Sequence, residues 1–107
     1  MKKLILIAAL AATAAHAEFK TGNDLLADLN DSSYFRQGIA LGYIMGAHDT
    51  GTGVTHCAPA TVTAGQVQDM VKRHLDAVPS ARHLSADSHV TYVLSKAWPC
   101  PKRGSGV

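Results

Sequence analysis

The chain contains two cysteines, Cys57 and Cys100, and whether they are bonded constrains its fold more than any other feature. Two cysteines allow a single intramolecular pairing. They would stay reduced in the cytoplasm, whereas an exported protein would be expected to join them in a disulfide. The N-terminal sequence is therefore examined first, because it indicates whether the protein stays in the cytoplasm or is exported.

The first 17 residues have the three parts of a secretory signal peptide. Two lysines precede an apolar run over residues 4–12, which is too short to span a bilayer, and Ala15-His16-Ala17 gives the small-residue pattern before a cleavage point. We expect cleavage before Glu18, export to the periplasm and a mature domain of residues 18–107. No later apolar stretch is long enough to cross a membrane, so no membrane association is expected after cleavage.

The charge of the chain changes when the signal peptide is removed. Loss of Lys2 and Lys3 from the ten basic residues leaves eight, which equals the number of acidic residues. The remaining domain of 90 residues has no formal net charge with histidine neutral, and it contains no basic stripe. The sequence therefore predicts one domain with no nucleic-acid partner.

The stretch AHDTGTGVTHCAPATVTAGQ, residues 47–66, places His56 directly before Cys57 and could be taken for a catalytic pair. A cysteine nucleophile must be free and deprotonated, usually beside a positioned histidine. A domain this small is expected to need a covalent staple, which would commit Cys57 to Cys100. We therefore predict a disulfide-bonded loop and no enzyme activity.

Polar capping residues followed by apolar residues at helical spacing predict an all-α fold, a small four-helix bundle-like domain with one disulfide. Residues 63–66 match a capping box before the third helix, Pro79 ends that helix, and Ser80 is expected to cap the fourth. The one short strand-like run, residues 90–93, is explained equally well by helical spacing. The predicted helices cover residues 23–30, 33–48, 64–77 and 80–97.

Each predicted helix has an apolar face that we expect to be buried. The expected core residues are Leu25, Leu26, Leu29, Ile39, Ala40, Tyr43, Ile44, Ala47, Val67, Met70, Val71, Leu75, Val78, Leu84, Ala86, Val90, Val93, Leu94 and Ala97.

Gly38, Gly42 and Gly46 recur every four residues along the second predicted helix. Each glycine in a helix interior costs about 1 kcal/mol relative to alanine, so three in one row require a compensating gain. The gain we expect is close approach of another helix. That helix belongs either to the same chain or to a second copy in a homodimer.

The mature chain keeps five histidines, and none of them suggests a metal centre. A zinc site needs three or four converging ligands, often spaced i, i+4 on a helix, and no two of these histidines have that spacing. We expect solvated or capping histidines, with no metal and no cofactor. The histidines are His48, His56, His74, His83 and His89.

Four motifs occur in a particular order along the chain: F-x-T-G-N-D-L-L at 19–26, GYIMGAHD at 42–49, CAPATVTAGQ at 57–66 and AWPC at 97–100. Their order and spacing resemble the Rap/Tai family of periplasmic immunity proteins of type VI secretion systems. The resemblance covers nearly the whole mature chain. It implies an all-helical protein, often a homodimer, that occludes the active-site cleft of a peptidoglycan amidase.

The sequence departs from the family at one point. Members commonly carry a second cysteine pair, with one cysteine in the first helix and one just before the Gly-Tyr-Ile stretch. Here those positions correspond to the neighbourhood of Leu29 and to Ala40. We therefore expect the first helix to be held more loosely.

An inhibitor that blocks a cleft needs a protruding, well-anchored segment, since a rigid segment loses little entropy on binding. The polar loop before Cys57 is the first candidate, the turn at residues 79–83 is the second, and an ordinary connector remains an alternative. A small periplasmic stress or chaperone-like protein without a toxin partner, and a structural or ligand-binding module, are the other functions considered. The predicted partner-binding residues are His48, Asp49, Thr50, Thr52, Val54, Thr55 and His56.

Overall fold

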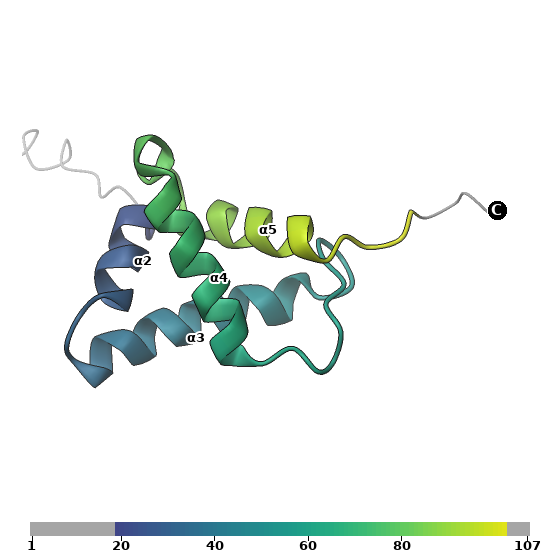
Figure 1. Ribbon diagram of the computed structural model, residues 1–107, viewed down its shortest axis with the longest axis horizontal. Helices are drawn as coiled ribbons and strands as arrows, with labels where there is room; N and C mark the ends of the chain where they lie inside the picture. Colours follow the sequence, from purple (N-terminus) through teal and green to yellow (C-terminus); the bar gives the residue numbers. More distant parts are fainter. Residues whose placement is uncertain (1–18, 103–107) are drawn as a thin grey trace, which may run out of the picture.

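The computed structural model describes residues 19–102. The predicted signal peptide, Glu18 and residues 103–107 lie outside the described residues. Four α-helices and one 3₁₀ turn make up the described part of the chain, which confirms the all-α fold (Figure 1). Their bounds are Gly22–Leu29 for α2, Tyr34–Gly51 for α3, Ala64–Ala77 for α4, Pro79–Ala81 for η2 and Ala86–Ala97 for α5.

The helices surround one small core. In Figure 1, α3 and α5 run in roughly the same direction and α4 crosses them, while α2 lies beside the start of α3. Within residues 19–102 the β-type pairing is limited to two isolated bridges, Thr21 with Ser85 and Thr52 with His56. In that same part of the chain, no helix has both the length and the apolar character needed to cross a bilayer.

Side-chain caps set where the helices begin. Capping boxes open α2, through Thr21 and Asp24, and α4, through Thr63 and Gln66. In each box the two side chains satisfy backbone amides that have no partner inside the helix. The second of these boxes was predicted from the sequence. The observed bounds of α4 agree with the predicted bounds, residues 64–77.

The prediction for the last helix was wrong at its start. The helix begins at Ala86, where Ser85 accepts a hydrogen bond from the Ser88 amide, and residues 79–81 form the separate turn η2. The backbone between these elements is bonded to the start of α2 instead, with Gly22 N donating to Leu84 O and Asn23 N donating to Arg82 O, both at 2.9 Å. These contacts hold residues 82–84 outside the helix.

The fully or largely buried core contains most of the predicted apolar residues. Three predictions were wrong, because Ile39, Leu84 and Ala97 are exposed. Leu84 was counted on a helical face, but it lies before the N-cap of α5. The core residues are Leu25, Leu26, Leu29, Ala40, Ile44, Val67, Val71, Leu75, Ala86, Val90 and Leu94.

The first helix, α2, packs into the core without a second disulfide, and the expectation that it is held more loosely stays a prediction. Leu29 and Ala40, at the positions of the expected second cysteine pair, both belong to the buried core. Asp28 adds a polar anchor, since its carboxylate is buried and lies 2.9 Å from the Lys20 ammonium and 3.6 Å from the Arg36 guanidinium. Apolar packing and ion pairs thus hold α2 at the positions where the family resemblance implies a second cysteine pair.

The glycine row on α3 does not pack against another helix of the same chain, so that interpretation was wrong. A Cβ atom placed at Gly38, Gly42 or Gly46 would have no neighbour within 4 Å. The row faces outward, with Phe35 and Ile39 exposed beside it. The alternative interpretation, contact with a second copy, is left as a proposal.

We expect Gly42→Ala to raise the free energy of unfolding of the single chain by about 1 kcal/mol, because alanine loses less conformational entropy in a helix. The space around Gly42 accommodates the added methyl group. Urea unfolding followed by circular dichroism at low protein concentration measures the change. A decrease in stability would show that another molecule occupies this space.

Candidate functional site

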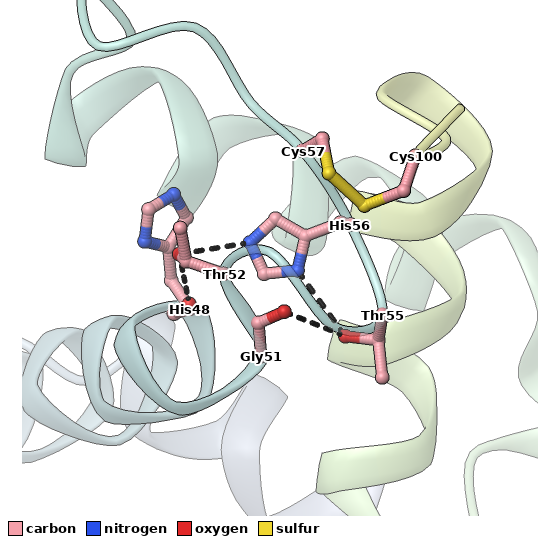
Figure 2. Close-up of a disulfide and its surroundings, with 7 residues drawn as sticks. All are labelled: His48, Gly51, Thr52, Thr55, His56, Cys57 and Cys100. Carbon is pink, nitrogen blue, oxygen red and sulfur yellow. Dashed lines mark hydrogen bonds between the residues drawn. A yellow bond between two sulfur atoms is a disulfide. The ribbon is translucent and has the colours of Figure 1, made fainter. Parts of the chain in front are cut away.

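The disulfide predicted between Cys57 and Cys100 is present, with the two Cα atoms 4.8 Å apart (Figure 2). It joins the loop after α3 to the segment that follows α5. The Cys57 amide reinforces the same junction by donating a hydrogen bond of 2.8 Å to the Trp98 carbonyl. With no free cysteine in the described residues, neither sulfur is a nucleophile.

The chain between α3 and the disulfide forms a compact turn, residues 51–56. The Gly51 carbonyl accepts from the amides of Val54 and Thr55 at 2.9 Å, and Gly53 N donates to His56 O at 2.8 Å. Gly53 has φ +80°, a conformation that glycine adopts without steric cost. A Cβ at Gly51 would lie 2.5 Å from Thr55 Oγ1, so the tightness of the turn also requires glycine at this position.

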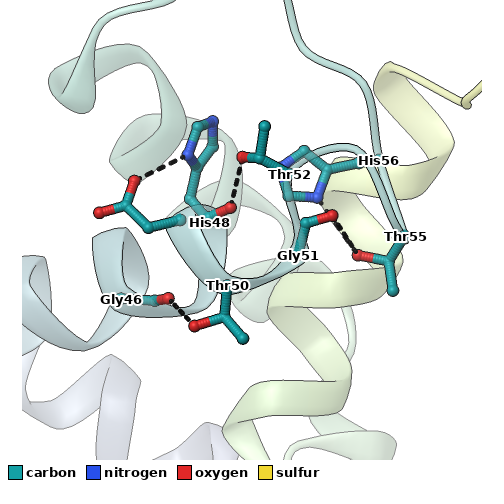
Figure 3. Close-up of polar contacts among 8 residues, drawn as sticks. Gly46, His48, Thr50, Gly51, Thr52, Thr55 and His56 are labelled. Atoms are coloured by element: carbon teal, nitrogen blue, oxygen red, sulfur yellow. Dashed lines mark hydrogen bonds and ion pairs between the residues drawn. The ribbon is translucent and has the colours of Figure 1, made fainter.

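His56 closes the turn from inside, with 1% of its surface exposed (Figure 3). Thr52 Oγ1 donates to His48 O at 2.6 Å, so toward His56 Nε2, at 3.5 Å, it acts as acceptor. Thr55 Oγ1 has one proton and two acceptors within reach, His56 Nδ1 at 3.3 Å and Gly51 O at 3.4 Å. When that proton points to Nδ1, a neutral imidazole links the two threonines.

The structure brings the predicted partner-binding residues together at one end of α3, but only some of their side chains are exposed. The helix runs three residues past the predicted end at His48, so Asp49 and Thr50 are helical. His48 is half-buried and tilts against the His56 ring, 4.8 Å between centroids, and His56 is buried. The residues whose side chains are presented outward are Asp49, Thr50, Thr52, Val54 and Thr55.

Two histidines have pKa values below the ordinary value of 6.5. Burial lowers the pKa of His56, and the neighbouring His48 lowers it further. Burial likewise lowers the pKa of His74 on α4, with His89 adding to the effect. The folded protein therefore favours neutral imidazole at both positions.

These depressed pKa values make stability depend on pH. Each histidine contributes stability that is fully present above the unfolded-state pKa of 6.5 and is lost as the pH falls below it. We expect the free energy of unfolding to fall with a slope of up to about 1.4 kcal/mol per pH unit for each histidine. Urea unfolding between about pH 7.5 and pH 5 measures the slope.

His56→Gln and His74→Gln are expected to flatten this dependence, whereas the exposed His83 offers a matched control. We expect His83→Gln to show the same slope of unfolding free energy against pH as the unchanged chain. The other two variants should show a smaller slope. Equal slopes in all three variants would contradict the assignment.

Within residues 19–102, no three side chains of the metal-binding types converge on one point. The site at the end of α3 instead consists of a braced turn with an apolar tip. Such an arrangement suits binding to another macromolecule.

A family model of the Rap1a immunity proteins matches residues 21–100, which is most of the chain. This chain belongs to the Rap1a immunity family. The resemblance to the Rap/Tai family found in the sequence is thereby confirmed. No curated protein matches the chain significantly.

Membership of the Rap1a family gives the protein the role of an immunity protein, which acts by binding a cognate secreted effector. Immunity proteins are generally not enzymes. In a Rap1a protein the functional question is therefore which surface meets the effector.

A second surface of this Rap1a protein was not predicted from the sequence. Tyr92 of α5 and Leu84 are about half exposed and border a groove between α4 and α5. The groove reaches the turn η2, so the second predicted contact segment, residues 79–83, lies at its edge. This surface could not be predicted from the sequence, because Leu84 was assigned to the core and Tyr92 lay outside the predicted apolar face.

Proposed function

We propose that this Rap1a protein is exported to the periplasm, where it binds and occludes the active site of a peptidoglycan amidase delivered by type VI secretion. The observation that carries the proposal is the braced turn at residues 51–56, with Val54 78% exposed at its tip. The amidase class and the periplasm come from the motif resemblance and the predicted signal peptide. The family match supports the more general role of immunity protein.

The turn has the properties that a blocking segment needs. Its backbone is fixed by hydrogen bonds to Gly51 O, its base is tied to α5 by the disulfide, and its interior is filled by His56. A segment that is rigid before binding loses little conformational entropy on binding. A solvent-exposed apolar tip on such a segment would gain by burial in a partner.

The surface beside the tip is hollow. A pocket of about 560 Å³ lies against the disulfide and is lined by Gly53, Val54, Cys57, Cys100 and Pro101. A partner could therefore surround Val54, with one wall of its cleft entering this hollow. Such interlocking surfaces are typical of tight inhibitors, in which a few central residues supply most of the affinity.

The proposal is tested with any peptidoglycan amidase that is encoded beside the gene for this protein. We expect one-to-one binding per subunit and loss of peptidoglycan cleavage in the complex. Val54→Lys should raise the dissociation constant by about tenfold to a hundredfold, the cost of disrupting a central contact. Ala77→Lys, which adds the same charge at an exposed site on α4, is the control and should bind normally.

The two possible failures have different meanings. If Val54→Lys still inhibits fully while circular dichroism shows normal helicity, the contact lies elsewhere on the surface. If the unchanged protein binds no neighbouring amidase, the amidase-inhibitor function is wrong for this member of the family.

We also propose that the outward glycine row on α3 is where two copies of the chain meet. In an antiparallel pair of α3 helices centred between Ala40 and Leu41, Phe35 would lie over Gly46 of the second copy and Ile39 over Gly42. Two large residues would then face two glycines, as self-complementary packing requires. Light scattering that shows a monomer at high micromolar concentration would rule this out, and Gly42→Leu should abolish a dimer that does form.

A further inference from the structure

The groove between α4 and α5 consists of two pockets on either side of one ring pair. His74 of α4 stacks on Tyr92 of α5, with 5.3 Å between ring centroids and 28° between planes. A pocket of about 400 Å³ on one side is lined by Val78, Ala81, Leu84, Ser88 and His89 together with the ring pair. A pocket of about 290 Å³ on the other side is lined by Met70, Arg73, Val93, Lys96 and Ala97 with the same two rings.

The two pockets differ in chemistry. Apart from Ser88 and the imidazoles, the first is apolar, and Leu84 at its edge is half exposed. The second has two cations, Arg73 and Lys96, and neither forms an ion pair within the described residues. Lys96 lies 5.7 Å above the Tyr92 ring. Neither pocket has a carboxylate among its described lining residues, although Arg73 also lines a neighbouring pocket with Asp69 and Asp76. The groove therefore places two cations without ion-pair partners in the described part of the chain next to apolar surface.

A buried histidine behind His74 allows the groove to gain one more charge. His89 Nε2 must donate to the Ala81 carbonyl at 2.8 Å, so neutral His89 accepts at Nδ1 from His74 Nε2, 3.0 Å away. This leaves Nδ1 of His74 as the position for an added proton. Protonation there keeps both hydrogen bonds intact, and it strengthens the bond from His74 to His89 because its donor becomes charged.

We propose that this groove binds a segment of a partner protein in which a large apolar side chain is adjacent to a carboxylate. The apolar side chain enters the pocket beside Leu84, and the carboxylate lies near Arg73 and Lys96. The surface goes beyond the proposed inhibitory contact, since its apolar pocket lies at the opposite end of α5 from the disulfide.

Binding of such a segment is coupled to proton uptake at His74. The charged and titratable groups around the histidine pair are Arg73 from α4, Tyr92 and Lys96 from α5, and Arg82, whose guanidinium donates to Leu75 O at 3.1 Å. From α2, Gly22 packs against His89. On α4, Asp69 and Asp76 line a neighbouring pocket together with Lys72 and Arg73. Lys72 pairs with Asp76, and neither carboxylate forms an ion pair with Arg73. A bound carboxylate supplies the negative charge that the groove lacks, so it favours charged His74 and binds more tightly at lower pH.

The test uses purified protein and an acetylated, amidated pentapeptide probe, Gly-Phe-Asp-Asp-Gly, followed by amide NMR shifts. We expect saturable shifts at His74, Leu84 and Tyr92 with a millimolar dissociation constant. That constant should decrease by about threefold to tenfold between about pH 7.5 and pH 5.5, which corresponds to a pKa rise of about half a unit to one unit. Peptides with Ala for Phe, or with Asn for both Asp residues, should bind more weakly.

Variants of the protein separate the parts of the site. Arg73→Gln and Lys96→Gln should each weaken binding by about twofold to fivefold, whereas Lys72→Gln, which removes an already paired cation of the same helix, should not. His74→Gln retains an amide donor for His89 and should bind with no pH dependence. The thermal unfolding of every variant is measured to show that it is folded.

Three results would overturn the proposal. The first is the absence of peptide-induced shifts at these residues at about 5 mM probe, a concentration that detects millimolar binding. The second is equal binding of the Ala and Phe peptides or of Arg73→Gln and the unchanged protein. The third is equally strong binding of phenylacetate alone, which would assign the groove to a small molecule. None of these experiments involves the amidase, so their outcome is independent of the inhibitory function.

Discussion

Replacing both Cys57 and Cys100 with serine is expected to lower the free energy of unfolding by about 4 kcal/mol. The bond closes a loop of 43 residues. In the chain-entropy model, losing the bond raises the conformational entropy of the unfolded chain and so destabilises the fold by about this amount. In a domain of this length that loss corresponds to a decrease in melting temperature of roughly 20 °C. The double variant avoids the free thiol that a single substitution would leave.

Urea unfolding of the oxidised protein, the reduced protein and the double serine variant measures this effect. The reduced protein and the double variant should agree with each other, because both lack the same covalent constraint. The turn at residues 51–56 should also become less ordered in both proteins, since the disulfide holds the residue that follows His56. A loss smaller than about 1 kcal/mol would mean that the hydrogen bond from Cys57 to Trp98 and the core packing hold this junction without it.

Gly22→Ala is expected to be strongly destabilising, with a cost of about 1–3 kcal/mol, the usual cost of overpacking a tight site. A Cβ at Gly22 would lie 2.8 Å from the Arg82 carbonyl oxygen and 2.8 Å from the His89 ring. The carbonyl belongs to backbone that accepts from the Asn23 amide, so it cannot move without breaking that bond. The His89 ring is held between Ala81 O and His74, so it cannot move freely either.

Gly42→Ala is the matched control, because it is the same substitution in another helix and is expected to act in the opposite direction. Denaturant unfolding of the two variants in parallel gives the difference directly. Equal effects of the two substitutions would show that helix propensity outweighs the contacts at Gly22.

These two glycines show what could and could not be predicted from the sequence. The start of α4 was predictable because its capping box is local, formed by Thr63 and Gln66, only three residues apart. The role of a glycine is not local. The row on α3 looked like a packing surface and faces outward, whereas Gly22, which did not stand out, is packed against residues 60 or more positions away.

The same distinction explains the errors in the candidate sites. Ser80 and Ser85 are both acceptable caps, and backbone bonds from α2 decide in favour of the second. His56 stood out in the sequence for its polarity and its position, but the fold uses it to fill the turn. The groove at Tyr92 exists because α4 and α5 lie side by side, which the spacing of residues along either helix does not reveal.

Lys20 determines how close to the fold a leader peptide can be removed. Its ammonium pairs with the buried Asp28, and its carbonyl accepts from the Ala86 amide at 2.8 Å. Cleavage before Glu18 would leave two residues ahead of this anchor, whereas a cut three residues further on would remove it. If the protein is exported as we propose, the position of signal-peptide cleavage would therefore affect the stability of the domain, because the cleavage point and this anchor lie within the same few residues.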